Sequence, residues 1–248
     1  MIRFLRQIRK DLIKQNKITR YLTYSIGEVL LVLIGILIAL EINNANERRK
    51  AREFEVKMLL EVKKALEQDL DFFENHLIGY RNKTEIDALA FFENYLITDK
   101  IDQDSIDYYF DRLTFGLQVT YNRGPYDALK TTGLDRVSND SLRNSMVFVY
   151  DFIYPRYKGL ITNGQDYASE KMYELKDMLS QSSNYKIIND KVHYSGVKLK
   201  PINIKTNKEF TELLEIAKQK SGWANEELKT LTPYMKELID LIATEINH

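Results

Sequence analysis

Residues 22–40, LTYSIGEVLLVLIGILIAL, decide the fold of this chain because they form one apolar run in which Glu28 is the single charged residue. At about 1.5 Å per residue, a helix over this run spans roughly 28 Å, close to the roughly 30 Å hydrocarbon core of a bilayer. A helix buried in a soluble protein is seldom apolar on every side over such a length. A cleaved signal peptide has a shorter apolar region followed by a small-residue cleavage site. The run therefore predicts an uncleaved transmembrane helix over residues 22–42.

The flanks of this helix differ in their content of lysine and arginine. Residues 1–21 carry seven of these against one acid, Asp11, and apolar residues recur among them every three or four positions. A basic amphipathic segment is typical of one lying on the anionic cytoplasmic leaflet, and a solvated charged tail is the alternative. Because fewer lysines and arginines follow the helix, the positive-inside rule predicts a cytoplasmic N-terminus. Residues 43–248 would then form a domain on the opposite side of the membrane.

One face of the predicted transmembrane helix differs from the rest in its residue types. Gly35 and Ala39 form a small-x-x-x-small pair, which lets two helix backbones approach closely. Glu28 shares this face, and a carboxylate in hydrocarbon should turn toward protein, water or a basic partner. The face predicts an interface with a second copy or with a partner membrane protein. Snorkelling of Glu28 to the headgroups and a proton-handling role are the alternatives. By their spacings of four, three, four and three, the residues of this transmembrane face are Glu28, Val32, Gly35, Ala39 and Ile42.

The composition and motifs of the sequence offer no recognisable catalytic site. The chain has no cysteine, which rules out disulfides, thiolate metal sites and cysteine nucleophiles. Its three histidines (His76, His193 and His248) are widely separated. No Gly-rich phosphate loop, nucleophile elbow or zinc-protease motif occurs in the sequence. We therefore expect no enzyme activity, no cofactor, no metal site and no nucleic-acid partner.

The periodicity of residues 43–248 predicts a mainly α-helical domain. A stripe with spacings of three and four predicts a stalk that continues from the membrane and becomes one helix of a bundle. It could pair with a copy of itself or with later helices of the chain. Thr84 to Ile97 repeats the pattern, with Ile86, Leu89, Phe92 and Leu96 expected on its buried side. The stripe consists of Leu59, Val62, Leu66, Leu70, Phe73, Leu77 and Tyr80.

The later part of the domain is punctuated by helix-boundary signals. Gly133 is expected to close a helix opened by Gly124-Pro125, and Ser138-Asn139-Asp140 to cap the next, which should end before Pro155. β-Branched residues around Asn189-Asp190 predict a short β-hairpin or an ordered loop within residues 185–204. The last predicted helix starts at residue 207. Gly222 is expected to interrupt it, Pro233 to kink or restart it, and Trp223, the only tryptophan, to lie at the edge of the core.

Polar residues around the Gly124-Pro125 bend admit two explanations. They could line a ligand cleft, or they could serve as helix caps and solvated surface charges. The candidate cleft residues are Arg123, Tyr126, Lys130, Arg136 and Arg143.

Two blocks of the sequence resemble a known family. Residues 24–47, YSIGEVLLVLIGILIALEINNANE, and residues 122–152, NRGPYDALKTTGLDRVSNDSLRNSMVFVYDF, are similar to Gram-negative bacterial membrane proteins classed as a domain of unknown function. The likeness spans roughly residues 1–160, and Ala45 stands where the family leads one to expect Trp. The resemblance implies a home in the bacterial inner membrane, where the orientation predicted from the flanks makes the domain of residues 43–248 periplasmic. It implies no catalytic residues.

Three functions fit these features. The first is a membrane-anchored structural or interaction protein that assembles through the transmembrane face and the stalk, with the lipid bilayer, further copies or a partner membrane protein as its contacts. The second is a periplasmic ligand-sensing module. The third is a subunit of an ion-coupled membrane complex that uses Glu28, like single-pass stator subunits in layout alone.

Overall fold

The computed structural model describes residues 18–97, 103–181, 185–194 and 196–247. These ranges are mainly helical and include one small antiparallel sheet, which confirms the predicted fold class. Most of the predicted basic segment 1–21 lies outside them. The chain divides into two compact units, Met1–Glu55 and Val56–His248. Helix α2 (Ile18–Asp71) contributes its first part to one unit and its remainder to the other.

The first unit contains the apolar stretch of α2. It belongs to the one helix in the described part of the chain that is long and apolar enough to cross a membrane. None of the most apolar window of this helix is buried by protein, and its large aliphatic side chains are exposed all round. Each such side chain would gain about 1.5–3 kcal/mol from leaving water, so this surface is suited to contact with lipid.

The polar continuation of α2 in the first unit is held as a helix by local pairs of opposite charge. Arg49 lies 3.7 Å from Glu53, and Lys50 contacts Glu47 at 3.1 Å. Arg52 pairs with Glu55 at 2.9 Å. Pairs three or four residues apart each stabilise an exposed helix by a few tenths of a kcal/mol. With no Gly or Pro in this stretch, α2 continues without a break.

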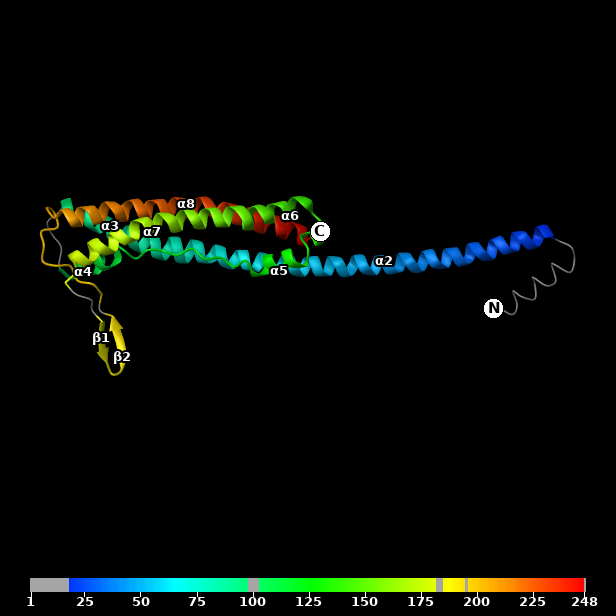
Figure 1. The fold of residues 1–248 in the computed structure, drawn as a ribbon, viewed down its shortest axis with the longest axis horizontal. Coiled ribbons are helices and arrows are strands. Elements are labelled where there is room, and N and C mark those ends of the chain that lie inside the picture. The colour runs from blue at the N-terminus through cyan, green and yellow to red at the C-terminus, as the bar shows by residue number, and fades with distance from the viewer. Residues whose placement is uncertain (1–17, 98–102, 182–184, 195, 248) are drawn as a thin grey trace. The chain divides into compact units, whose positions relative to one another are not determined.

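The second unit is a helical bundle that carries a projecting hairpin (Figure 1). Helices α7 and α8 pack against each other in opposite directions, and the later part of α2 lies in the same bundle. In chain order its elements after α2 are η1 (Phe72–Asn82, a π-helix), α3 (Lys83–Ile97), α4 (Gln103–Arg112), α5 (Gly124–Thr132), η2 (Leu134–Arg136), α6 (Asp140–Val147), η3 (Phe148–Ile153, a π-helix), α7 (Tyr154–Leu179), β1 (Tyr185–Ile188), β2 (Lys191–Tyr194) and α8 (Lys208–Ile246).

Most of the predicted stripe on α2 and η1 is buried inside this unit. Leu59, Val62, Leu66, Phe73 and Leu77 are all shielded from water, so their packing partners come from the same chain. Tyr80, at the end of the stripe, is instead exposed. The reason is the π-helix η1, whose wider turns shift the angular position of each residue relative to an α-helix.

The buried face of α3 differs from the predicted one. Leu89 and Phe92 are buried as expected, but Ile86 and Leu96 are exposed. The buried positions on this helix are Glu85, Ala88, Leu89 and Phe92. The prediction was wrong for Ile86 because its neighbour Glu85, an acid, takes the inward position and pairs there with a lysine of α8.

An aromatic cluster joins the helices at the end of the bundle near the hairpin. Phe92 of α3 meets Phe210 of α8 edge to face, with ring centres 5.0 Å apart. Phe110 of α4 stacks on the same ring at 6.4 Å. Met172 and Leu175 of α7 belong to this core too. Edge-to-face contacts add to the stabilisation from burial, so the cluster fixes α3, α4, α7 and α8 together.

The predicted helix boundaries are partly confirmed. Gly133 ends α5 with a φ of 110°, and the Asn139 side chain caps α6 by accepting from the backbone N–H groups of Ser141 and Leu142. The end predicted before Pro155 was wrong. The chain passes from α6 through η3 into α7, where Pro155 lies in the first turn and needs no N–H partner.

The hairpin and the last helix complete the fold. Strand β1 pairs with β2 in the register Tyr185↔Tyr194, and Asn189 and Asp190 form its turn with positive φ, as predicted. Helix α8 then runs from Lys208 to Ile246 without a break, so the interruption expected at Gly222 was wrong. Pro233 lies inside this helix, and flanking core residues such as Leu231 and Met235 remain fully buried.

Candidate functional site

The predicted transmembrane face lies on the exposed apolar stretch of α2. Val32 and Ile42 are exposed, and Gly35 and Ala39 are open between them. A Cβ atom built on Gly35 would meet nothing within 4 Å. Glu28 is half-buried at the start of the face. Helical periodicity alone places these five residues on one side, and the interface with a second helix stays a prediction.

Three of the five predicted cleft residues converge on one carboxylate that the sequence did not single out, Asp151 of η3. Lys130 donates to its Oδ2 at 2.6 Å, the Tyr126 hydroxyl donates to the same atom at 2.8 Å, and Arg123 donates to Oδ1 at 2.9 Å. Burial tends to raise the pKa of the Asp151 carboxyl, but these hydrogen bonds outweigh it and hold the pKa below the ordinary value. The cluster ties α5 to η3.

The other two predicted cleft residues lie apart from this cluster. Arg136 donates to the backbone oxygen of Thr132, and Arg143 donates to that of Val137 and to the carboxylate of Asp140. Both arginines therefore close local turns around α5 and α6. The structure does not bring all five residues to one cleft.

A row of four tyrosine rings in contact, which we call the tyrosine ladder, begins at the Asp151 cluster and consists of Tyr126, Tyr150, Tyr154 and Tyr121. Tyr126 and Tyr150 stack at 4.4 Å with nearly parallel rings, and Tyr121 and Tyr154 stack at 4.1 Å. Asp69 of α2 ends the ladder and accepts the Asn122 backbone N–H at 2.9 Å. Burial raises the pKa of the Asp69 carboxyl, against the lowering effect of its hydrogen bonds.

A second buried polar centre joins α3 to α8. Lys220 Nζ lies 2.5 Å from Glu85 Oε1, and the Ser221 hydroxyl donates to Glu85 Oε2 at 2.6 Å. Next to it, Lys176 of α7 donates to the Thr114 hydroxyl at 2.7 Å, and burial lowers the pKa of this lysine. Periodicity alone could not reveal the centre, because it depends on residues more than a hundred positions apart.

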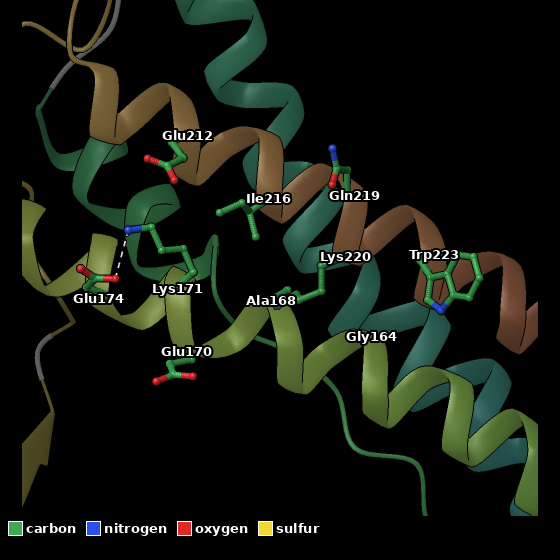
Figure 2. A pocket seen from close by; sticks show the side chains of 10 residues that line it. All are labelled: Gly164, Ala168, Glu170, Lys171, Glu174, Glu212, Ile216, Gln219, Lys220 and Trp223. Atoms are coloured by element: carbon green, nitrogen blue, oxygen red, sulfur yellow. Dashed lines mark hydrogen bonds and ion pairs between the residues drawn. The ribbon is translucent and has the colours of Figure 1, made fainter.

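Above this centre, α7 and α8 form the walls of a groove of about 810 Å³ (Figure 2), which we call the α7–α8 groove. Small residues on α7, Gly164 and Ala168, face Ile216 and Trp223 on α8 and make its floor apolar. A Cβ atom on Gly164 would come within 3.1 Å of Trp223 Cδ1, so the glycine lets the indole lie against the backbone of α7. Trp223, expected at the edge of the core, is 50% exposed.

The acidic residues of the groove and Lys171 form a charged rim at the end away from Trp223 (Figure 2), whereas Gln219 lies on α8 near the indole. Lys171 contacts Glu174 there at 3.0 Å. Glu170 and Glu212 complete this rim, and neither forms an ion pair with any residue in the described ranges. Lys220 lines the groove with its stem, while its ammonium is directed to Glu85 below.

A family of unknown function, DUF6090, matches residues 28–218, more than half of the chain. This chain belongs to the DUF6090 family. No curated protein and no solved structure matches it. The family assignment therefore rests on sequence alone.

The DUF6090 match covers both parts of the structure. It begins at Glu28, the first residue of the transmembrane face, and extends through the bundle to Lys218 in α8. It therefore includes Glu85, the Asp151 cluster and the α7 wall of the groove. Lys220 and Trp223 lie just beyond its end. Membership in DUF6090 confirms the predicted uncharacterised family and assigns no activity.

Proposed function

We propose that this protein is a single-pass anchor of the bacterial inner membrane that carries a periplasmic helical domain and assembles with further copies through its transmembrane face. The observation that supports the anchor is the apolar stretch of α2, none of which is covered by the rest of the described chain. Lipid is the environment in which such a surface costs nothing to expose.

Assembly is assigned to the membrane part because the later stripe of α2 is already occupied. Leu59 to Leu77 pack inside their own bundle, which leaves residues 43–53 as the largely exposed stalk. Gly35 and Ala39 offer an open surface on which a second helix backbone can approach closely. Glu28 on the same face would then be sheltered from hydrocarbon by the neighbouring helix.

Membrane fractionation tests the anchor. We expect the full chain to stay with membranes after an alkaline carbonate wash, which removes peripheral proteins. Recovery of folded protein in the soluble fraction without detergent would refute the proposal. Because the chain has no cysteine, a single Glu237→Cys variant can report the side on which the domain lies, through labelling by a membrane-impermeant reagent in intact and opened cells. If the introduced cysteine stayed unlabelled after the outer membrane had been permeabilised, the domain would lie in the cytoplasm and the proposed orientation would be wrong.

The oligomeric mass in detergent tests the transmembrane face. We expect Gly35→Leu to lower this mass, since the added side chain separates the two backbones. Gly27→Leu is the matched control, because Gly27 lies about 100° round the helix from Glu28 and is equally free of neighbours. An unchanged mass for Gly35→Leu, or equal losses for both variants, would remove this face as the interface.

A ligand-binding role for the bundle is a second candidate function, favoured by the α7–α8 groove. Its volume falls within the range of small-molecule sites, and its floor is apolar with charged groups at the rim. The two functions are compatible, because the groove is formed by α7 and α8 and the proposed anchor by the first part of α2.

A further inference from the structure

We infer that the α7–α8 groove binds an elongated organic cation, with an ammonium group at one end and an apolar or aromatic group at the other. This inference deepens the second candidate function and does not depend on assembly through the transmembrane face. It follows from the charge, shape and polarity of the groove.

The charge of the groove is negative. Glu170, Glu174 and Glu212 line it against the ammonium groups of Lys171 and Lys220. The charge of Lys220 is neutralised by Glu85, which lies beneath the groove. Both side chains are buried. Three carboxylates facing the single ammonium of Lys171 leave a net surplus of two negative charges. An anionic ligand would be repelled at this rim, whereas a cation would be attracted.

The groove is also polarised along its length. Figure 2 shows the carboxylates of Glu174 and Glu212 at one end and the indole of Trp223 at the other. Along α8, the rise from Glu212 to Trp223 is about 16 Å. Between these ends lie Ala168 and Ile216, which present no polar side chain, and the uncharged amide of Gln219. A ligand that fits must therefore be long, apolar in its middle and positively charged at one end.

Trp223 is the group that the apolar end would contact. Its indole rests against Gly164 on one side, yet half of the residue remains exposed. A large aromatic side chain left half in water gains free energy when a ligand covers it. Ala168, the next groove residue along α7, has only a methyl side chain, so the groove beside the ring stays open for such a ligand.

The single tryptophan makes the inference directly testable, because all tryptophan fluorescence of the full chain comes from the groove. The probe is phenylbutylamine, added to the full chain in detergent micelles, which contribute no tryptophan. Phenylvalerate is the anionic probe of similar length, and phenylbutanol is the neutral one. We expect a saturable shift of the emission to shorter wavelength with the amine, a weaker response with the alcohol and none with the carboxylate.

Variants separate charge recognition from unspecific partitioning. We expect the double substitution Glu170→Gln, Glu212→Gln to weaken amine binding by about five- to tenfold, as two exposed charge interactions would. Glu237→Gln, an exposed site on α8 outside the groove, should leave binding unchanged. Circular dichroism of both variants checks that the bundle is intact.

Four outcomes would overturn the inference. These are equal binding of the carboxylate and the amine, no saturable response to any probe, unchanged amine affinity in the double variant, and an emission shift that depends on protein concentration without any probe. The last would show that a second copy fills the groove. None of them would affect the fractionation result, so failure here is distinguishable from failure of the membrane anchor.

Discussion

Lys220 of α8 and Glu85 of α3 form an ion pair 2.5 Å long in which the two side chains are only 2% and 1% exposed. The Ser221 hydroxyl and the Gly116 backbone N–H donate to the same carboxylate, so its oxygens are well supplied with donors. Removing one charge from such a pair leaves the other buried without compensation, which typically costs about 3–5 kcal/mol. The pair therefore makes the contact of α3 with α8 sensitive to single substitutions.

We predict that Lys220→Met lowers the free energy of unfolding by about 3–5 kcal/mol, whereas Lys220→Met combined with Glu85→Gln regains much of the loss. Chemical denaturation of the full chain in detergent, followed by circular dichroism, measures both. The control is Lys83→Met, which breaks a 2.6 Å pair with Asp87 whose side chains are 64% and 53% exposed. That change should cost less than about 1 kcal/mol. Equal losses for the two lysines would contradict the prediction.

The stacked pair of Tyr126 and Tyr150 offers a comparison within one ring stack. The Tyr150 hydroxyl is buried and has no hydrogen-bond partner among the residues that the structure describes, whereas the Tyr126 hydroxyl donates to Asp151 at 2.8 Å. A buried polar group without a partner costs free energy, so Tyr150→Phe should leave stability unchanged or raise it by up to about 1 kcal/mol. Tyr126→Phe should lower it by about 1 kcal/mol or more. Denaturation midpoints in the opposite order would show that the Tyr150 hydroxyl is satisfied after all.

These buried polar groups mark the limit of what the sequence predicts. The apolar run, the mainly helical domain, the hairpin and the caps at Gly133 and Asn139 were predictable because each depends on residues close together in the chain. The inward position of Glu85 was not predictable. Periodicity assigns the buried face of a helix from its apolar residues, and it therefore selected the neighbouring Ile86. The π-helix η1 explains a separate error, the exposure of Tyr80, since its wider turns shift the angular positions of its own residues.

The candidate sites were harder to predict for the same reason. Asp151 collects Arg123, Tyr126 and Lys130 only because α5 folds back on η3, more than twenty residues later. The α7–α8 groove likewise depends on how two distant helices pack. The single signal for it in the sequence was Trp223, which was expected at the edge of the core.

The buried carboxyl group of Asp69 should make the folded protein less stable as pH rises. Burial raises the pKa of its carboxyl in the folded protein above the ordinary value of 3.8, so the folded state keeps this proton to a higher pH than the unfolded state does. Stability relative to the non-ionising variant Asp69→Asn should therefore fall as pH rises above about 3.8 and level off above the folded pKa. Each unit by which folding raises the pKa contributes about 1.4 kcal/mol to this fall. Denaturation of both proteins across a pH series measures the difference, and a constant or rising difference would refute the raised pKa.

Two glycines in helical surroundings should respond oppositely to the same substitution. Gly133 ends α5 with a φ of 110°, a conformation that residues with a Cβ atom rarely adopt, and a Cβ there would collide with the Asp135 carboxylate. We predict that Gly133→Ala lowers the free energy of unfolding by about 1–3 kcal/mol. Gly159 lies inside α7 with open space around it, so Gly159→Ala should raise that free energy by about 0.5–1 kcal/mol.

The contrast between these two variants isolates backbone conformation, because each adds one methyl group to a glycine. Thermal unfolding of both variants in the same detergent gives the comparison, with far-ultraviolet circular dichroism as the readout. If Gly133→Ala proved neutral, the turn between α5 and η2 would have to relax to a negative φ. The hydrogen bond from the Arg136 backbone N–H to the Gly133 carbonyl, 3.2 Å in this structure, would then be lost. Faster amide exchange at Arg136 in that variant would report the rearrangement directly.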